Sequence, residues 1–158
     1  KSQILLSLDL EQTYWRTFLT SCQLFPFIRE LLIYIKSKNI KTAIVTDLTA
    51  QIQFRKIIYF GLEDFFDYIV TSEESGQDKP DKSSFELVLN KLELEAKSCW
   101  MIGDSYKSDI LGSMQLGIVG IQKINFPLKD EKKFNSADGT FEEFKSIYSF
   151  LREFEFRN

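Results

Sequence analysis

Short apolar runs that end abruptly in hydroxyl or carboxylate residues are the feature that most limits what this chain can fold into. Ala43-Ile44-Val45 leads into Thr46-Asp47, and Trp100-Met101-Ile102 leads into Gly103-Asp104-Ser105. Runs this short, with no polar alternation, are typical of strands buried on both faces of a parallel sheet. In such sheets ligands bind outside the carboxyl ends of the strands. We therefore expect these polar residues to meet at one edge of a sheet.

Segments with helical periodicity separate the strands. The spacing predicts helices after residue 26, over 50–59, over 81–92, after residue 104 and after residue 140, and further strands over 68–71 and 118–121. Thr140 and Glu143 have the spacing of a capping box at the start of the last helix. Residues 125–139, with a cluster of charges, are expected to form a solvated loop. Strands that alternate with helices through short connections predict an α/β fold, a Rossmann-like parallel sheet with helices on both faces.

The composition excludes several kinds of chemistry. The 158 residues contain no histidine, which excludes serine–histidine and cysteine–histidine catalysis and histidine metal sites. A metal would be held by oxygen ligands and would be a hard ion such as Mg²⁺. The net charge of −3 gives no reason to expect a nucleic acid or an anionic membrane as partner.

The sequence also predicts the cellular compartment of the protein. No apolar run approaches the roughly 20 residues needed to span a bilayer, and the beginning does not resemble a signal peptide. Cys22 and Cys99 are isolated among apolar residues and are expected to be free thiols. Free thiols are typical of the reducing cytoplasm.

Three groups of residues are candidates for a phosphate and metal site. Thr46 can bind a phosphate oxygen, and Lys79, in a Lys-Pro-Asp sequence, can neutralise a phosphate or a carboxylate. Asp104 and Asp109 can ligate or support a metal. Each group has a structural alternative, which is helix capping for Thr46 and Asp104 and solvent exposure for Lys79 and Asp109. Their occurrence together favours the functional interpretation.

In this order the motifs resemble those of the haloacid dehalogenase-like (HAD) superfamily, particularly its phosphatases with a helical cap inserted after the first motif. Thr46 resembles the Ser or Thr of the second motif, and Lys79-Pro80-Asp81 resembles the third. Gly103-Asp104 with Asp109 resembles the fourth. The resemblance runs from about residue 25 to residue 121.

The resemblance implies a Mg²⁺-dependent phosphatase that acts on a small phosphorylated metabolite through an aspartyl-phosphate intermediate. Thr46 and the backbone N–H of Asp47 would bind the phosphoryl oxygens, and Lys79 would neutralise charge. Asp104 would ligate Mg²⁺, with Asp109 supporting the metal site.

The first motif of the family, whose Asp is the nucleophile, has no clear counterpart. The nearest match is Asp9-Leu10-Glu11-Gln12-Thr13, in which Glu11 stands where the family has the Asp that acts as general acid and base. The same segment has helical spacing. We therefore expect residues 1–24 to be the tail of a helical cap and residues 25–158 to be the core, with a degenerate first motif at Asp9 as the alternative.

In this family the strand of the first motif lies between the strands that end at Thr46 and at Asp104. Without a strand there, backbone N–H and C=O groups would be left unpaired, which is unfavourable. Two arrangements would pair them: residues that precede Lys1 in the whole protein, or a strand formed by Ile4 to Leu8.

Two other functions are compatible with the sequence. One is a haloacid dehalogenase-type hydrolase, which needs no metal, although the pair Asp104 and Asp109 favours the Mg²⁺-dependent branch. The other is a non-catalytic HAD-like module that binds a ligand or a protein partner, for which the aromatic series Phe150, Phe154 and Phe156 could form an interface. The substrate and the oligomeric state are left open, because the cap largely determines specificity in capped members of the family.

Overall fold

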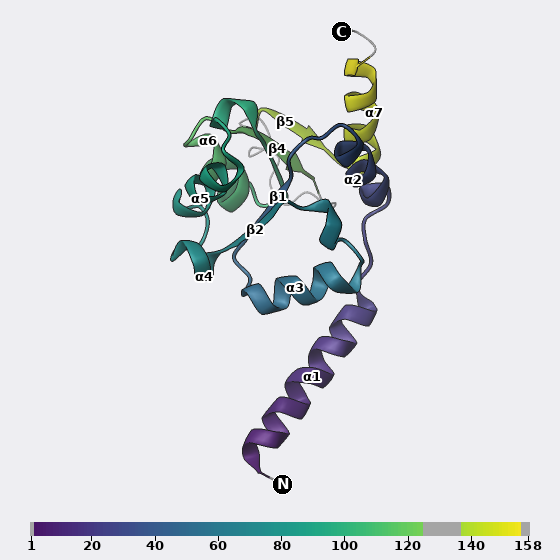
Figure 1. Ribbon diagram of the computed structural model, residues 1–158, viewed down its shortest axis with the longest axis vertical. Coiled ribbons are helices and arrows are strands. Elements are labelled where there is room, and N and C mark those ends of the chain that lie inside the picture. The colour runs from purple at the N-terminus through teal and green to yellow at the C-terminus, as the bar shows by residue number, and fades with distance from the viewer. Residues whose placement is uncertain (1, 125–136, 156–158) are drawn as a thin grey trace.

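The computed structural model in Figure 1 describes residues 2–124 and 137–155 and has the α/β fold that the sequence predicts. The longer helices are α1 (Gln3–Ser21), α2 (Ile28–Ser37), α3 (Ala50–Tyr59), α5 (Ser83–Leu92) and α7 (Phe144–Glu155). The shorter ones are α4 (Ser72–Ser75), α6 (Gly112–Met114), η1 (Glu63–Phe65), η2 (Ala96–Ser98) and the π-helical η3 (Tyr106–Leu111). The strands are β1 (Ala43–Thr46), β2 (Tyr68–Thr71), β3 (Trp100–Gly103), β4 (Val119–Lys123) and β5 (Gly139–Phe141).

The strands form two parallel sheets. β1 pairs with β2, with Thr46 opposite Thr71, while β3 pairs with β4 and β4 with β5. Within the described ranges no strand joins β1 to β3. Ile4 to Leu8 belong to α1, so the alternative in which this segment completes the sheet is wrong. The segment is rich in leucine, which favours a helix.

α2 packs against both sheets through two successive side chains. Leu31, 2% exposed, lies in a cluster with Phe141 and Ile147 that also contacts β3 and β4. Leu32, 6% exposed, lies in a second cluster with Ile57 and Leu62 that contacts β1 and β2. Successive residues of a helix point about 100° apart. α2 therefore contributes apolar side chains to the core of both sheets.

The end of the described chain differs from the prediction. Thr140 lies in β5 opposite Gln122 of β4, and α7 begins only at Phe144, so the predicted capping box at Thr140 and Glu143 is wrong. Pairing with β4 gives the backbone of β5 its hydrogen-bond partners, so Thr140 is part of a strand and not a helix cap.

The apolar face predicted for this last helix is largely confirmed, because Phe144, Ile147, Tyr148 and Leu151 pack against the cluster around Leu31. Most of the loop predicted over 125–139, and Phe156, lie outside the described residues.

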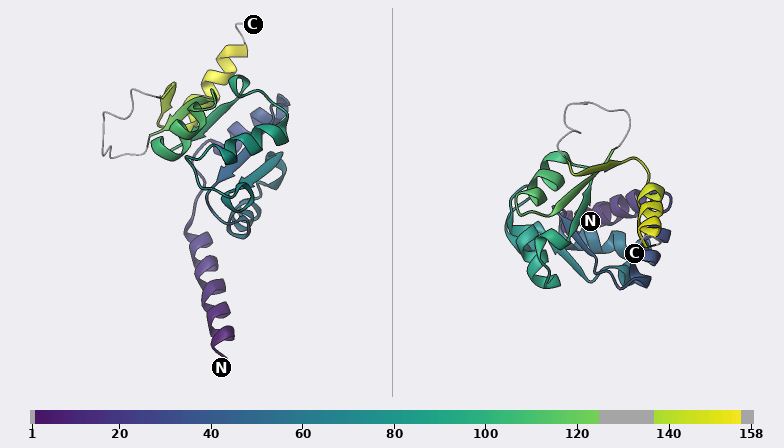
Figure 2. Two further views of the ribbon diagram at one scale, coloured as in Figure 1. Left: turned by 90° about the vertical axis from the view of Figure 1, so that its left-hand side faces the viewer. Right: turned by 90° about the horizontal axis from the view of Figure 1, so that it is seen from above.

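α1 projects from the α/β body (Figures 1 and 2), and its helical state confirms the interpretation of its spacing. Its C-terminal half touches α3, where the Lys56 Nζ lies 5.4 Å from the centroid of the Phe18 ring. At its other end Ile4 and Leu10 are 79% and 62% exposed. Its role as the tail of a cap stays a prediction. No helix in the described ranges, α1 included, has the length and apolar character needed to span a bilayer.

The interior around Phe85 offers a test of this packing. Phe85 is 1% exposed, and a Cβ at Gly112 would lie 2.7 Å from its Cε2 atom, so the ring fills the space that the glycine leaves. We expect Phe85→Ala to lower the free energy of unfolding by about 3–5 kcal/mol, because it leaves a cavity. Phe54→Ala, at a side chain 46% exposed, should cost less than about 1 kcal/mol. Urea unfolding measures both, and equal losses would contradict the packing.

Candidate active site

Lys79 is the centre of the candidate site. Its Nζ donates to Oδ1 of Asp109 at 2.7 Å and to the carbonyl oxygen of Val45 at 3.1 Å. The side chains of Lys79 and Asp109 are each 9% exposed. Val45 belongs to β1, whereas Asp109 belongs to η3, which follows β3. One ammonium group therefore bridges the carboxyl ends of the two sheets.

Asp47 positions the loop that carries Lys79. Its Oδ1 accepts a hydrogen bond from the backbone N–H of Lys79 at 2.9 Å, and its backbone carbonyl accepts one from the Ser72 hydroxyl at 3.3 Å. The Lys79–Pro80 peptide bond is cis. The sequence predicted only that the N–H of Asp47 binds a phosphoryl oxygen; that role stays a prediction, and the structure adds a role for the carboxylate.

Thr46 ends β1 and is half-buried. Its Oγ1 accepts a hydrogen bond from the N–H of Leu48 at 3.1 Å, so the hydroxyl closes a turn and does not cap α3. The first N–H of that helix, from Ala50, donates instead to Oε2 of Glu73 at 2.8 Å. A hydroxyl that accepts one bond still has its own hydrogen to donate. Thr46 can therefore donate to a phosphate oxygen at this edge.

Asp109 uses both of its carboxylate oxygens. Oδ1 pairs with Lys79, and Oδ2 accepts from the N–H of Ser105 at 3.1 Å. A Cβ at Gly103 would lie 2.4 Å from Oδ2, so only glycine leaves room for this carboxylate. Asp109 is buried rather than solvated, which removes the structural alternative considered for it. The residue that caps η3 is Ser105, whose Oγ accepts from the N–H of Ser108, and not Asp104.

Asp104 lies exposed just after β3. Its backbone carbonyl accepts a hydrogen bond from Nε2 of Gln122 at 3.2 Å. Gln122 is 6% exposed, and its buried Oε1 atom has no hydrogen-bond partner among the described residues. Sequence reasoning missed Gln122, whose only signal is a polar side chain inside the short run of β4.

The carboxylates at this edge fit a hard divalent ion only in part. Among the residues that the structure describes, no three Asp, Glu or Cys side chains are grouped as a metal site. Mg²⁺ usually keeps several waters and takes one or two protein carboxylates. The exposed Asp104 can serve as such a ligand. Asp109 is better suited to holding Lys79 and the turn, because both of its oxygens are engaged.

Asp81 begins the turn into α5, two residues after Lys79. The hydroxyl and the backbone N–H of Ser83 both donate to its carboxylate and hold the pKa of Asp81 below its usual value. A carboxyl whose pKa is lowered by folding adds stability above its unfolded pKa and loses that contribution as the pH falls through the folded pKa.

The lowered pKa of Asp81 predicts how stability depends on pH. We expect Asp81→Asn to lower the melting temperature slightly at neutral pH, because a neutral amide is a weaker acceptor. The difference from the unaltered protein should shrink as the pH falls below about 4 and vanish below the folded pKa of Asp81, where the native carboxyl is also protonated. Melting temperatures recorded across this range check the prediction, and a constant difference would contradict it.

The buried ion pair predicts a large effect on stability. Asp109→Asn removes the negative partner of Lys79 and should lower the free energy of unfolding by about 3–5 kcal/mol, because a buried ammonium loses its counter-charge. The matched control is Glu86→Gln in the exposed pair Lys82–Glu86, whose atoms lie 3.0 Å apart. That change should cost at most about 1 kcal/mol. Similar losses in denaturant unfolding would show that Lys79 is not held as the structure has it.

Comparison with known proteins identifies the family. The profile of haloacid dehalogenase-like hydrolases matches residues 7–122. The ribulose-1,5-bisphosphate 5-phosphatase of Halopiger xanaduensis is 35% identical over 133 residues, which are 84% of this chain and 54% of that protein. The glyceraldehyde 3-phosphate phosphatase of Methanocaldococcus jannaschii is 26% identical over 140 residues, 89% of this chain and 61% of that protein. The chain thus spans little more than half the length of these relatives.

A solved structure agrees with this result. A HAD-hydrolase of Bacillus subtilis, bound to magnesium, superposes with a TM-score of 0.76 at 25% identity, over 92% of this chain and 62% of that one. The predicted family is therefore confirmed. The family profile covers most of this chain, and Lys79 is paired with Asp109 at the carboxyl ends of the strands. This chain therefore belongs to the haloacid dehalogenase-like hydrolases.

Proposed function

We propose that the protein is a Mg²⁺-dependent phosphatase for a small phosphorylated metabolite, with a helical cap that ends in α1. The observation that supports this most is the ammonium group of Lys79, which is held between Val45 and Asp109, while Thr46 ends β1 and Asp104 follows β3. The two named relatives are phosphatases, and the magnesium-bound neighbour supports the metal. Free Cys22 and Cys99 suit a reducing compartment such as the cytoplasm.

The residues of this chain have separate tasks in that reaction. Thr46 donates its hydroxyl hydrogen to a phosphoryl oxygen, and Lys79 balances the negative charge that collects there. Asp104 would hold Mg²⁺, which supplies a Lewis acid for the phosphoryl group. Asp109 and Asp47 fix Lys79 by its side chain and its backbone. Gln122 holds the backbone of Asp104.

The nucleophile has to come from elsewhere in the protein. Asp9 lies in α1, the helix that projects from the body (Figure 1), and not at the carboxyl ends of the strands. We propose that a strand outside these residues pairs with β1 and β3 and carries the attacking Asp. All residues of β1 are only half-buried, and Trp100 of β3 is 45% exposed, which leaves both strands open to a further neighbour.

The chemistry of the proposed reaction has two steps. A carboxylate oxygen of that Asp bonds to phosphorus as the bond from phosphorus to the substrate oxygen breaks, and the released oxygen takes a proton. Water then hydrolyses the acyl phosphate, which frees inorganic phosphate and restores the carboxylate. A chain that binds phosphate without this nucleophile would instead be a non-catalytic module.

The metal role of Asp104 gives the test of this function. In the protein that carries the nucleophile strand, hydrolysis of p-nitrophenyl phosphate should need Mg²⁺ and stop with EDTA. Asp104→Asn should lower kcat at least about 10²-fold, the usual cost of losing one preorganised electrostatic group. The matched control is Asp78→Asn, the same change at an exposed loop residue, which should leave kcat unchanged.

Two outcomes would contradict the proposal. Turnover of p-nitrophenyl phosphate that is indifferent to EDTA would contradict the Mg²⁺ requirement and the metal role of Asp104. No turnover, together with no rise in melting temperature when Mg²⁺ and beryllium fluoride are added, would favour a non-catalytic module.

A further inference from the structure

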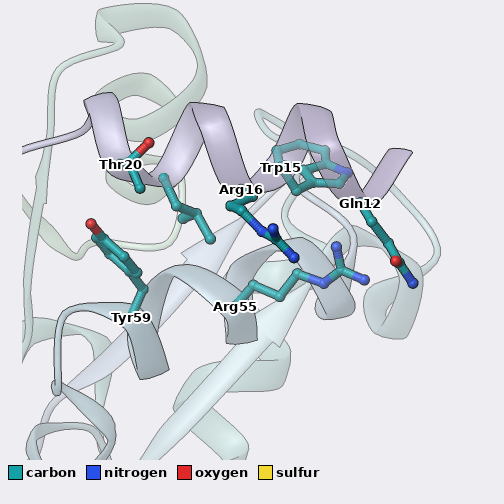
Figure 3. Close-up of a pocket in the computed structure, with 7 residues that line it drawn as sticks. Gln12, Trp15, Arg16, Thr20, Arg55 and Tyr59 are labelled. Carbon is teal, nitrogen blue, oxygen red and sulfur yellow. The ribbon is translucent and has the colours of Figure 1, made fainter. Parts of the chain in front are cut away.

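A pocket of about 330 Å³ lies between α1 and α3, apart from the residues of the candidate active site. Figure 3 shows its lining. Gln12, Trp15, Arg16 and Thr20 come from α1, and Arg55 and Tyr59 come from α3. Thr46, Lys79, Asp104 and Asp109 do not line it. The pocket is therefore a second candidate site, which the sequence motifs do not indicate.

Two arginines converge on this pocket. Arg16 reaches down from α1 toward Arg55 of α3, whose guanidinium extends toward the Gln12 side chain (Figure 3). Among the residues with described positions, none that lines the pocket is a carboxylate, and α3 carries Arg55 and Lys56 but no acidic residue. In the two described ranges, neither arginine forms a salt bridge. Two like charges that face one pocket without a counter-ion repel each other, and a bound anion would remove that repulsion.

The lining also suggests the kind of anion. A guanidinium presents a planar fork of N–H donors that matches phosphate and carboxylate groups. Gln12 adds an amide, and Trp15 and Tyr59 add apolar faces, whereas the Thr20 hydroxyl already donates to the Thr17 carbonyl at 2.9 Å. Arg55 is half-buried, so its interaction with an anion is less screened by water than at an open surface. A small organic molecule that bears a phosphate fits this combination better than a bare inorganic ion.

We propose that Arg16 and Arg55 form a binding site for the anionic group of a small phosphorylated metabolite, separate from the site at Lys79. The ligand is either the far phosphate of a substrate whose other phosphate reaches Lys79, or a second molecule. The two sources share the same chemistry at the arginines. The anion site itself does not depend on the proposed catalytic function.

The chain has a built-in probe for this site. Of its two tryptophans, Trp15 lines the pocket and Trp100 lies in β3. In a Trp100→Phe protein the fluorescence therefore reports on the pocket alone. We expect fructose 6-phosphate and fructose 1,6-bisphosphate to change it saturably at low ionic strength.

Substitution of the arginines tests the assignment. Arg55→Gln and Arg16→Gln should each weaken binding at least about tenfold, because each removes a charge-assisted hydrogen bond. Arg55→Lys keeps the charge but loses the planar fork of donors, so its affinity should lie between those of the parent and of Arg55→Gln. Arg152→Gln on α7 is the matched control and should bind as the parent does. Circular dichroism of each variant shows whether α1 and the fold are retained.

A further variant, titrated with Mg²⁺ present so that the metal proposed at Asp104 can contact a phosphate, separates the two sources of the ligand. If Asp104→Asn leaves both affinities unchanged and the two sugars bind equally, the ligand is a second molecule. If the bisphosphate binds more tightly and loses that advantage in Asp104→Asn, one substrate spans both sites. Either result supports the arginine site. An unchanged Trp15 signal with both sugars at 10 mM or so, far above the usual range of metabolite affinities, or equal binding by the arginine variants and the control, would overturn it. A protein inactive as a phosphatase with an intact titration would overturn the proposed function alone.

Discussion

The position of the Lys79 ammonium group is the constraint on which the functional edge of this protein depends. It donates to the end of β1 and to the carboxylate that follows β3, and no strand in the described ranges joins these two strands. A buried charge is stable only with such partners. Gly103 leaves the room for Asp109, and Asp47 holds the backbone of Lys79. In the proposed function, the residues that keep the lysine in place therefore also position the group that balances the charge of the phosphate.

Much of the fold could be predicted from the sequence, because local patterns determine local structure. The strand over 68–71 and the helix over 50–59 have the bounds that their apolar spacing predicts. The predictions are wrong where contacts with residues distant in the sequence determine the secondary structure. Thr140 has the local signature of a cap, but β4 lies beside it and draws it into a strand. The segment from Ile4 to Leu8 was open to two interpretations, and no strand in the described part of the chain lies beside it to stabilise the extended one.

The candidate site likewise combines features that the sequence predicts with features that depend on distant contacts. Order along the chain predicted that Lys79, Asp104 and Asp109 gather at one edge, and the structure joins Lys79 to Asp109. The order of the motifs did not predict that both oxygens of Asp109 accept hydrogen bonds or that the carboxylate of Asp47 holds a loop. Nor did it predict that Gln122 donates to the backbone of Asp104. Such contacts depend on the register of strands and on side-chain direction, which spacing alone does not contain. The pair Arg16 and Arg55 was missed for that reason too, because it forms only when α1 lies along α3.

The most direct measurement of the central claim is a crystal structure of the whole protein with Mg²⁺ and orthovanadate. We expect vanadate within hydrogen-bond distance of Thr46 Oγ1 and Lys79 Nζ, the metal on Asp104, and Lys79 still paired with Asp109. Vanadate bound away from Lys79, or a metal that does not touch Asp104, would contradict the assignment of this edge as the phosphoryl site.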